Sequence, residues 1–173
     1  MARKFSPRHE KFCPKRSAAR KLDRMYRILA VTLSAAILAT ATFAAPKAAG
    51  PVVQVFKSPT CGCCSKWIEH MRTSGFDVRA TNVDDMTAVK TSYRVPEQLQ
   101  SCHTATVDGY AIEGHVPAWD VRRVLKERPR IAGIAVPGMP VGSPGMETPG
   151  TKPQPFNVMS FDGHGKTSVF AKY

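Results

Sequence analysis

The sequence predicts one α/β domain over residues 51–173, preceded by an export segment. Three observations support this fold class. Short β-branched runs alternate with stretches of helical periodicity, three cysteines lie between the first run and the first helical stretch, and a segment rich in Gly, Pro and Met precedes a last β-hairpin. A chain of 173 residues is long enough for one such domain plus accessory segments.

The N-terminal segment has the features of a secretory signal peptide behind a basic leader. Residues 1–27 contain ten Lys or Arg and two acidic residues, and residues 28–46 contain no charge. Small residues around Ala44 suit the positions that precede a cleavage site. We therefore expect a basic leader plus signal peptide over residues 1–44, cleavage near Ala44, and a periplasmic or exported protein. Met25 is an alternative start of the chain.

Most of the positive charge lies outside the expected domain. The leader carries +8 of the net charge of +12, so we expect no binding to nucleic acid. Residues 45–50 form a short linker between the signal peptide and the domain. An uncleaved apolar run would instead anchor the chain in a membrane, and we expect no other membrane contact.

The first half of the domain has a strand–helix–strand–helix pattern. Residues 52–56 form a β-branched run, and the helix after it begins within the cysteines 61–64. Its apolar stripe has helical spacing and consists of Cys64, Trp67, Ile68 and Met71. Ser74-Gly75 ends this helix, and residues 76–83 form the second strand. Asp84 or Asp85 caps the next helix, which covers residues 86–93 and stops before Pro96.

The second half combines a hairpin, a helix, a loop and a last hairpin. Asp108-Gly109 joins strands over residues 104–107 and 110–113. A helix follows Pro117, with Val121, Val124 and Leu125 on one face, and ends at Arg128-Pro129. Four Pro and four Gly among residues 137–150 predict a loop. The last hairpin pairs residues 156–161 with 167–173.

This order of elements resembles the thioredoxin-like fold, in which a cysteine motif lies at the N-terminus of the first helix. Free backbone N–H groups and the helix dipole stabilise a thiolate there. Thioredoxin-like proteins place a cis-proline before the third strand, facing the motif. This chain has Ser101-Cys102-His103-Thr104 at the comparable point and no proline. The resemblance therefore implies that Cys102 approaches residues 61–64 in space.

The cysteines favour a soft-metal site over a redox dithiol and over structural disulfides, and both of these alternatives remain open. Cys13 lies in the leader, so the mature chain keeps Cys61, Cys63, Cys64 and Cys102. Their crowding makes two unstrained disulfides difficult. The Cys61-x-x-Cys64 spacing alone suits a redox dithiol, half of a zinc site or a Cu(I) site. The extra thiol of Cys63 complicates redox pairing but can bridge Cu(I) ions, so we favour Cu(I).

Four further residues are secondary candidates for metal ligation. Met139 and Met146 lie in a Gly/Pro loop, where no helix or strand face exists to bury them. His103 is adjacent to Cys102, and His115 follows the second hairpin strand; either can ligate a metal or orient a ligand. His70 and His164 have simpler roles as a solvated side chain and a turn residue.

Four motifs together resemble the CopG-like copper-resistance family, which carries a CxCC motif and was long described as a domain of unknown function. They are SPTCGCC at 58–64, SCHT at 101–104, IEGHVP at 112–117 and VPGMPVGSPGME at 136–147. The resemblance implies a periplasmic thioredoxin-like domain that binds several Cu(I) ions, bridged by sulfur, in copper-resistance systems. A redox role has also been proposed for that family. The ligands implied by position are Cys61, Cys63, Cys64 and Cys102.

The sequence thus supports three functional hypotheses. The first is a periplasmic protein that holds copper, as Cu(I), and works with other copper-resistance proteins. The second is an enzyme, a thiol–disulfide oxidoreductase that uses Cys61 and Cys64. The third is a structural or interaction domain whose cysteines only form disulfides. We expect a metal-binding protein in preference to an enzyme.

Overall fold

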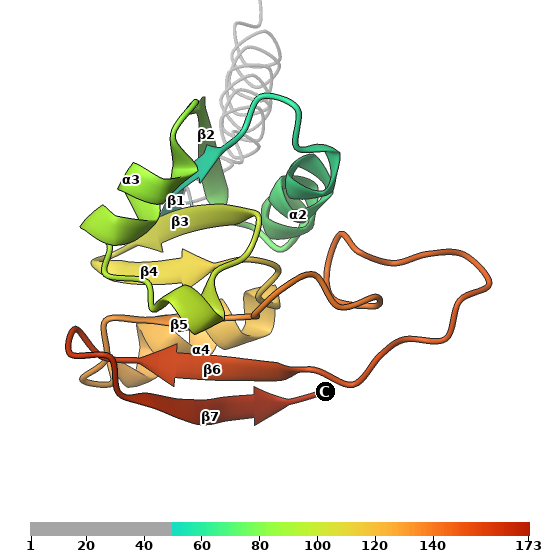
Figure 1. The fold of residues 1–173 in the computed structure, drawn as a ribbon. Coiled ribbons are helices and arrows are strands. Elements are labelled where there is room, and N and C mark those ends of the chain that lie inside the picture. Colours follow the sequence, from blue (N-terminus) through green and yellow to red (C-terminus); the bar gives the residue numbers. More distant parts are fainter. Residues whose placement is uncertain (1–49) are drawn as a thin grey trace, which may run out of the picture. The chain divides into compact units, whose positions relative to one another are not determined.

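A mixed β-sheet of seven strands organises the part of the chain that the computed structural model describes, residues 50–173. The predicted leader, signal peptide and cleavage point, the alternative start at Met25 and most of the predicted linker lie outside the described residues. The strands are arranged in the order β2-β1-β3-β4-β5-β6-β7 (Figure 1). They are β1 (Val52–Lys57), β2 (Asp77–Asn82), β3 (His103–Val107), β4 (Tyr110–Glu113), β5 (Gly133–Ala135), β6 (Asn157–Phe161) and β7 (Thr167–Lys172).

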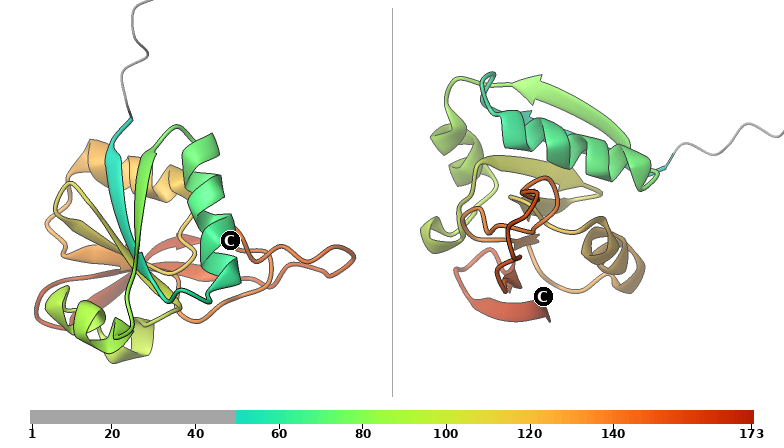
Figure 2. Two further views of the ribbon diagram at one scale, coloured as in Figure 1. Left: turned by 90° about the horizontal axis from the view of Figure 1, so that it is seen from above. Right: turned by 90° about the vertical axis from the view of Figure 1, so that its right-hand side faces the viewer.

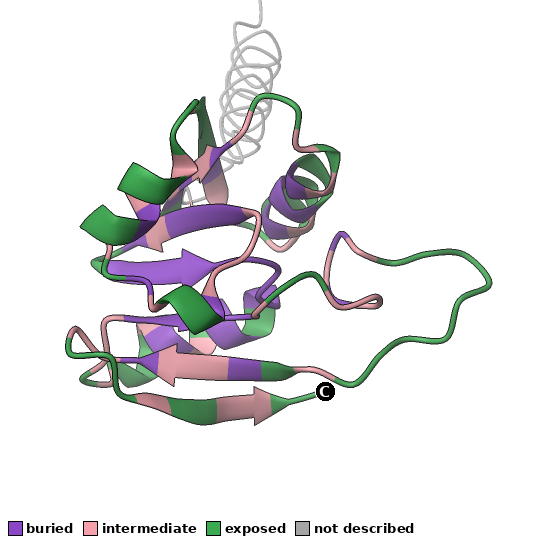
Figure 3. Ribbon diagram, viewed as in Figure 1, coloured by how far each residue is buried: buried purple, intermediate pink, exposed green. Residues whose placement is uncertain are grey.

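The pairing of the strands follows from their connections. β1 pairs in parallel with β2 through a helical crossover, and antiparallel with β3. β3 and β4 form a hairpin, β4 and β5 are parallel, and the remaining pairs are antiparallel. The strands in the middle of the sheet are buried, whereas β7 at the edge is exposed or half-buried (Figure 3).

Helices cover both faces of the sheet. The helices are α2 (Gly62–Thr73), α3 (Met86–Ser92), α4 (Ala118–Glu127) and a short 3₁₀ turn, η2 (Glu97–Leu99). α2 and α4 pack into one core with alternate residues of the strands, such as Val53, Val55 and Ile112. α3 and η2 lie on the face of the sheet opposite to α4 (Figure 2). On that face, Leu99 of η2 packs with Ala111 of β4.

The helix that carries the cysteines forms as its apolar pattern predicts. Cys64, Trp67, Ile68 and Met71 are its buried residues, so the predicted stripe is confirmed. The stripe has to face the sheet, which fixes the rotation of the helix about its axis. Cys61 occupies the N-cap position, and no side-chain hydrogen bond caps that end, so side chains do not satisfy the N–H groups of the first turn.

The predicted hairpin and the last helix are also confirmed. Asp108 and Gly109 have φ values of 51° and 88°, as a type I′ turn requires. Arg128 ends α4 in the left-handed conformation. Apart from the short turn η2, the order of elements through α4 is the predicted one, and the fold class is α/β. The thioredoxin-like assignment stays an interpretation. No helix within residues 50–173 combines the length and the apolar character that a membrane span requires.

Two elements were not predicted, η2 and β5. Each has three residues, too few to show a period of 2 or 3.6. β5 also depends on Gly133, because a Cβ at that position would lie 2.2 Å from the carbonyl oxygen of Ala111 on β4. The close backbone approach, rather than any side-chain pattern, makes this segment a strand.

Replacing the N-cap of α3 should lower stability without altering the cysteines. The Asp85 side chain accepts a hydrogen bond from Ala88 N at 3.0 Å. Asp85→Ala should therefore reduce the free energy of unfolding by about 1 kcal/mol, measured by urea denaturation. The matched control is Asp84→Ala, at an exposed neighbour with no capping role; an equal loss in both variants would contradict the assignment.

Candidate metal centre

Strand pairing brings the four cysteines of the domain together. Cys61 N-caps α2 and Cys63 and Cys64 lie in its first turn, just after β1. Cys102 immediately precedes β3, and the β1–β3 register pairs Lys57 with His103. The end of β1 and the start of β3 are therefore neighbours, and the segments that continue from them meet.

The sulfur atoms form one group, named here the cysteine cluster (Cys61, Cys63, Cys64 and Cys102). Cys63 Sγ lies 3.5 Å from Cys61 Sγ and 3.9 Å from Cys102 Sγ. All four sulfurs lie within 4.8 Å of one another. The predicted approach of Cys102 to the motif is thus confirmed. Thiolates at such separations can share one ion or bridge several.

Within this cluster, Cys61 and Cys64 form a disulfide, and Cys63 and Cys102 are free thiols. Two electrons and two protons convert the disulfide to two thiols. Only the reduced state offers four sulfur donors to a metal ion.

Two buried histidines adjoin Cys102 and extend the donor set. Cys102 Sγ lies 3.1 Å from His115 Nε2 and 3.3 Å from His103 Nδ1. His115 Nδ1 donates to the carbonyl oxygen of Pro144 at 2.7 Å, which leaves the lone pair of Nε2 facing the sulfur. His103 packs against Trp67 at 4.5 Å between ring centroids, and its buried Nε2 lacks a hydrogen-bond partner within the described residues. Both secondary histidine candidates therefore lie at the cluster.

Burial keeps these donors uncharged in the metal-free protein. Desolvation holds the pKa of His103 well below its usual range, and His115 and Lys90 lower it further. Burial also lowers the pKa of His115, against an opposing effect of the Pro144 hydrogen bond. Burial and the neighbouring Cys63 raise the pKa of Cys102 to about 12. Neutral imidazoles are the form that binds metal ions.

The two methionine candidates of the Gly/Pro loop, Met139 and Met146, lie in different surroundings. Met146 lines a hollow of about 350 Å³ beside Cys63, whereas the side chain of Met139 is 52% exposed and is not among the lining residues. The loop lies close to α2, since a Cβ on Gly145 would be 2.7 Å from Trp67 N. Met146 is thus placed near the cluster, and the structure gives no support to Met139. The hollow is lined by Gly62, Cys63, Lys66, Gly145, Met146, Glu147 and Thr148.

Sequence reasoning missed two polar groups around the site. Lys90 and Glu113 form a buried ion pair with 2.5 Å between Nζ and Oε1. A charged residue between Ile112 and Gly114, inside an apolar strand, was the available signal.

The expectation that His70 is a solvated side chain was wrong: it is half-buried, and its Nε2 accepts a hydrogen bond from Ala118 N at the start of α4. Burial lowers the pKa of His70, which keeps it an acceptor.

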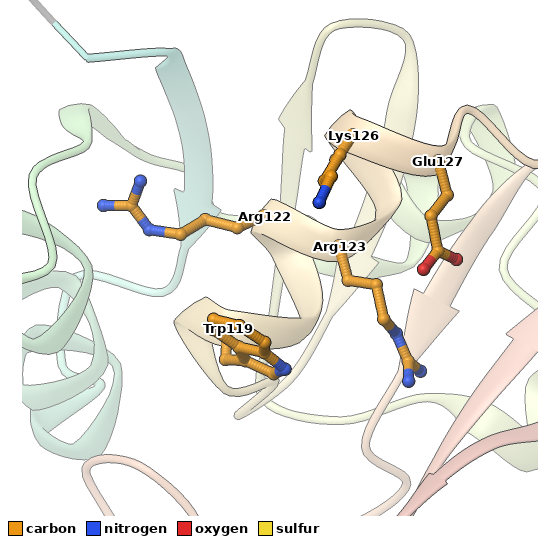
Figure 4. Close-up of a pocket in the computed structure, with 5 residues that line it drawn as sticks. All are labelled: Trp119, Arg122, Arg123, Lys126 and Glu127. Carbon is orange, nitrogen blue, oxygen red and sulfur yellow. The ribbon is translucent and has the colours of Figure 1, made fainter.

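A second hollow, of about 290 Å³, lies along α4 and is a weaker candidate (Figure 4). Trp119, 72% exposed, lies at one end of it. Its arginines already bind elsewhere: Arg123 contacts the ring and the carbonyl of Phe170, and Arg122 donates to Ser74 O. None of its lining residues is a thiol or an imidazole, so the cysteine cluster is the better candidate for chemistry.

Comparison with known proteins identifies the family. Two solved structures are titled copper resistance protein copG, form 1 and form 2. Each is 44% identical to this chain, with a TM-score of 0.68, and the match covers 72% of this chain and 98% of the solved one. The chain belongs to the CopG-like copper-resistance family. A family model described as a protein of unknown function, DUF411, matches residues 99–146. Among curated proteins, no significant match is found.

The family-model match falls on the Cys102 half of the site. The segment matched by the family model contains Cys102, His103 and His115, together with the Gly/Pro loop up to Met146. The predicted resemblance to this family is confirmed, and the chemistry of the cluster fits a copper-related function. The donor set, four sulfurs with two neutral imidazoles beside them, suits a soft or borderline transition metal.

The raised pKa of Cys102 gives a prediction for this CopG-like protein. With no metal bound and the Cys61–Cys64 disulfide closed, Cys102 should react with iodoacetamide at a rate that rises tenfold per pH unit through pH 9, because the thiolate stays a minor species until about pH 12. Mass spectrometry of the alkylated peptide measures this rate. The same thiol in denaturant should level off near its ordinary pKa; a plateau near pH 9 in the folded protein would contradict the assignment.

Proposed function

We propose that the protein is a periplasmic copper-binding protein that holds Cu(I) at the cysteine cluster and acts in copper resistance. The observation that carries the proposal is the convergence of Cys61, Cys63, Cys64 and Cys102 on one point of a CopG-like fold. Thiolates are soft ligands, and Cu(I) is the soft ion for which closely packed thiolates are best suited. The sequence of the export segment supports the periplasmic location.

The residues around the cluster suit this role. Trp67 Nε1 donates to Val116 O at 2.9 Å, which holds the segment after β4 on α2 and so positions His115. In the proposal His103 and His115 orient or complete the ligand set, and Met146 offers a thioether at the hollow beside Cys63. Copper ions are the partners that this chemistry implies, and other copper-resistance proteins are the expected source or recipient.

An anaerobic titration of Cu(I) against a chromogenic chelator tests the proposal. The fully reduced protein should withdraw Cu(I) from bathocuproine disulfonate, and the variant with all four cysteines of the cluster changed to Ser should not, because the soft donors are gone. Met139→Leu is the matched control, since it removes an exposed thioether that the structure does not place near the cluster. Equal binding by wild type and the four-Ser variant would overturn the proposal.

A thiol–disulfide oxidoreductase is the second candidate function, favoured by the Cys61–Cys64 disulfide at the start of α2. Two molecules of glutathione would reduce this bond, giving two protein thiols and one glutathione disulfide. Cys63 lies 3.5 Å from Cys61 and competes with Cys64 as the resolving thiol.

Redox exchange can be separated from catalysis in one experiment. In glutathione buffers, we expect reversible oxidation of Cys61 with Cys64, detected by alkylation and mass spectrometry, and its loss in Cys61→Ser. Turnover of a protein disulfide such as insulin by the metal-free protein would favour the enzyme. Reversible oxidation without turnover would leave copper binding as the function.

A further inference from the structure

An ion pair between Lys90 and Glu113 lies in the interior beside the segment that carries Cys102. The Lys90 side chain is 7% exposed and that of Glu113 is fully buried. Lys90 comes from α3, which covers one face of the sheet, and Glu113 ends β4. Two charges in such a place need hydrogen-bond partners within the protein, because little of either side chain is open to solvent.

The carboxylate of Glu113 contacts both ends of the segment Ser101–Thr104. Oε1 accepts a hydrogen bond from the backbone N–H of Ser101 at 2.6 Å, and Oε2 accepts one from the hydroxyl of Thr104, also at 2.6 Å. Lys90 Nζ reaches Oε1 and, at 3.3 Å, the Thr104 hydroxyl. Cys102 and His103 are the two residues between the anchored ends.

The strand that ends at Glu113, β4, also positions His115, the histidine that follows it and contacts the Cys102 sulfur. β3 and β4 pair Thr104 with Glu113, and Gly114 N donates to His103 O at 2.9 Å. His115 follows two residues after Glu113 and faces the Cys102 sulfur. One carboxylate thus sets the position of Cys102 relative to His115.

Stability alone is a weak reason for this pair. Buried ion pairs contribute little compared with apolar residues of the same volume, since desolvation offsets their attraction. A role in placing a ligand accounts for the contacts of each carboxylate oxygen.

We propose that Glu113, with its charge balanced by Lys90, is a positioning residue that holds Cys102 where it completes the cysteine cluster. This inference rests on the proposed copper-binding function, but the anchoring itself acts in the metal-free protein. Without it, the segment Ser101–Thr104 loses a hydrogen bond at each end, and the Cys102 sulfur leaves its place near Cys63.

The test compares double variants that leave no unpaired buried charge. Glu113→Gln/Lys90→Met keeps an amide oxygen that can accept from Ser101 N, whereas Glu113→Leu/Lys90→Met removes the acceptor at a similar volume. Thr104→Val removes the other anchor and leaves the ion pair intact. Val158→Ala, a core truncation on β6, controls for a general loss of stability.

Two measurements are made on each reduced protein: the rate of Cys102 alkylation without metal, and Cu(I) affinity by competition. The Glu113→Leu/Lys90→Met variant should speed alkylation and weaken Cu(I) binding about 10- to 100-fold, as removal of residues that orient ligands does in other metal sites. Thr104→Val should show smaller changes in the same direction. The Gln-containing variant should stay near wild type, and Val158→Ala should change only the unfolding midpoint.

The outcomes separate this inference from the proposed function. Should wild type fail to bind Cu(I) while Cys102 alkylation still responds to the anchors, copper binding is wrong and the positioning role stands. Unchanged alkylation and unchanged Cu(I) binding in both Thr104→Val and the Leu-containing variant would overturn the positioning role. So would a Gln-containing variant that loses as much as the Leu-containing one.

Discussion

The antiparallel pairing of β1 with β3 is the constraint on which the site depends. Residues 61 and 102 are far apart in the chain, and they meet because Lys57 pairs with His103. Only a short turn, in which Cys61 N donates to Ser58 O, separates the end of β1 from α2. Register is strongly specified in a sheet with a buried face, since a shift of one residue would expose the core residues Val53 and Val55. The hydrophobic core therefore indirectly fixes the distance between thiols.

The site also shows how a core supports polar chemistry. His103, His115 and Glu113 are all fully buried beside apolar residues such as Ile112 and Val116. His115 has a backbone carbonyl as its partner and Glu113 a lysine, whereas Nε2 of His103 has no partner within the described residues. Dry surroundings strengthen such contacts and penalise any charge that lacks one.

Much of this molecule could be predicted from its sequence, because its periodic segments are long enough to show a face. The stripe of α2, the Asp108-Gly109 turn and the Gly/Pro loop all follow from local rules. The position of Cys102 required a resemblance to a known fold, since pairing between distant strands leaves no local trace. The Lys90–Glu113 pair and the bond from Ala118 to His70 were missed for that reason: each joins residues from two elements. The three-residue strand β5 was missed because it is too short for a pattern.

The Cys61–Cys64 bond has a consequence for the kind of metal ion that this place prefers. With that bond closed, the sulfur donors that remain are Cys63 and Cys102, and the nitrogen donors nearest to Cys102 are His103 and His115. Cys102 with the imidazoles of His103 and His115 is a group of mixed donors that suits ions of intermediate hardness, whereas four thiolates suit the softest ions. The state of one covalent bond thereby selects between two donor groups that share the sulfur of Cys102.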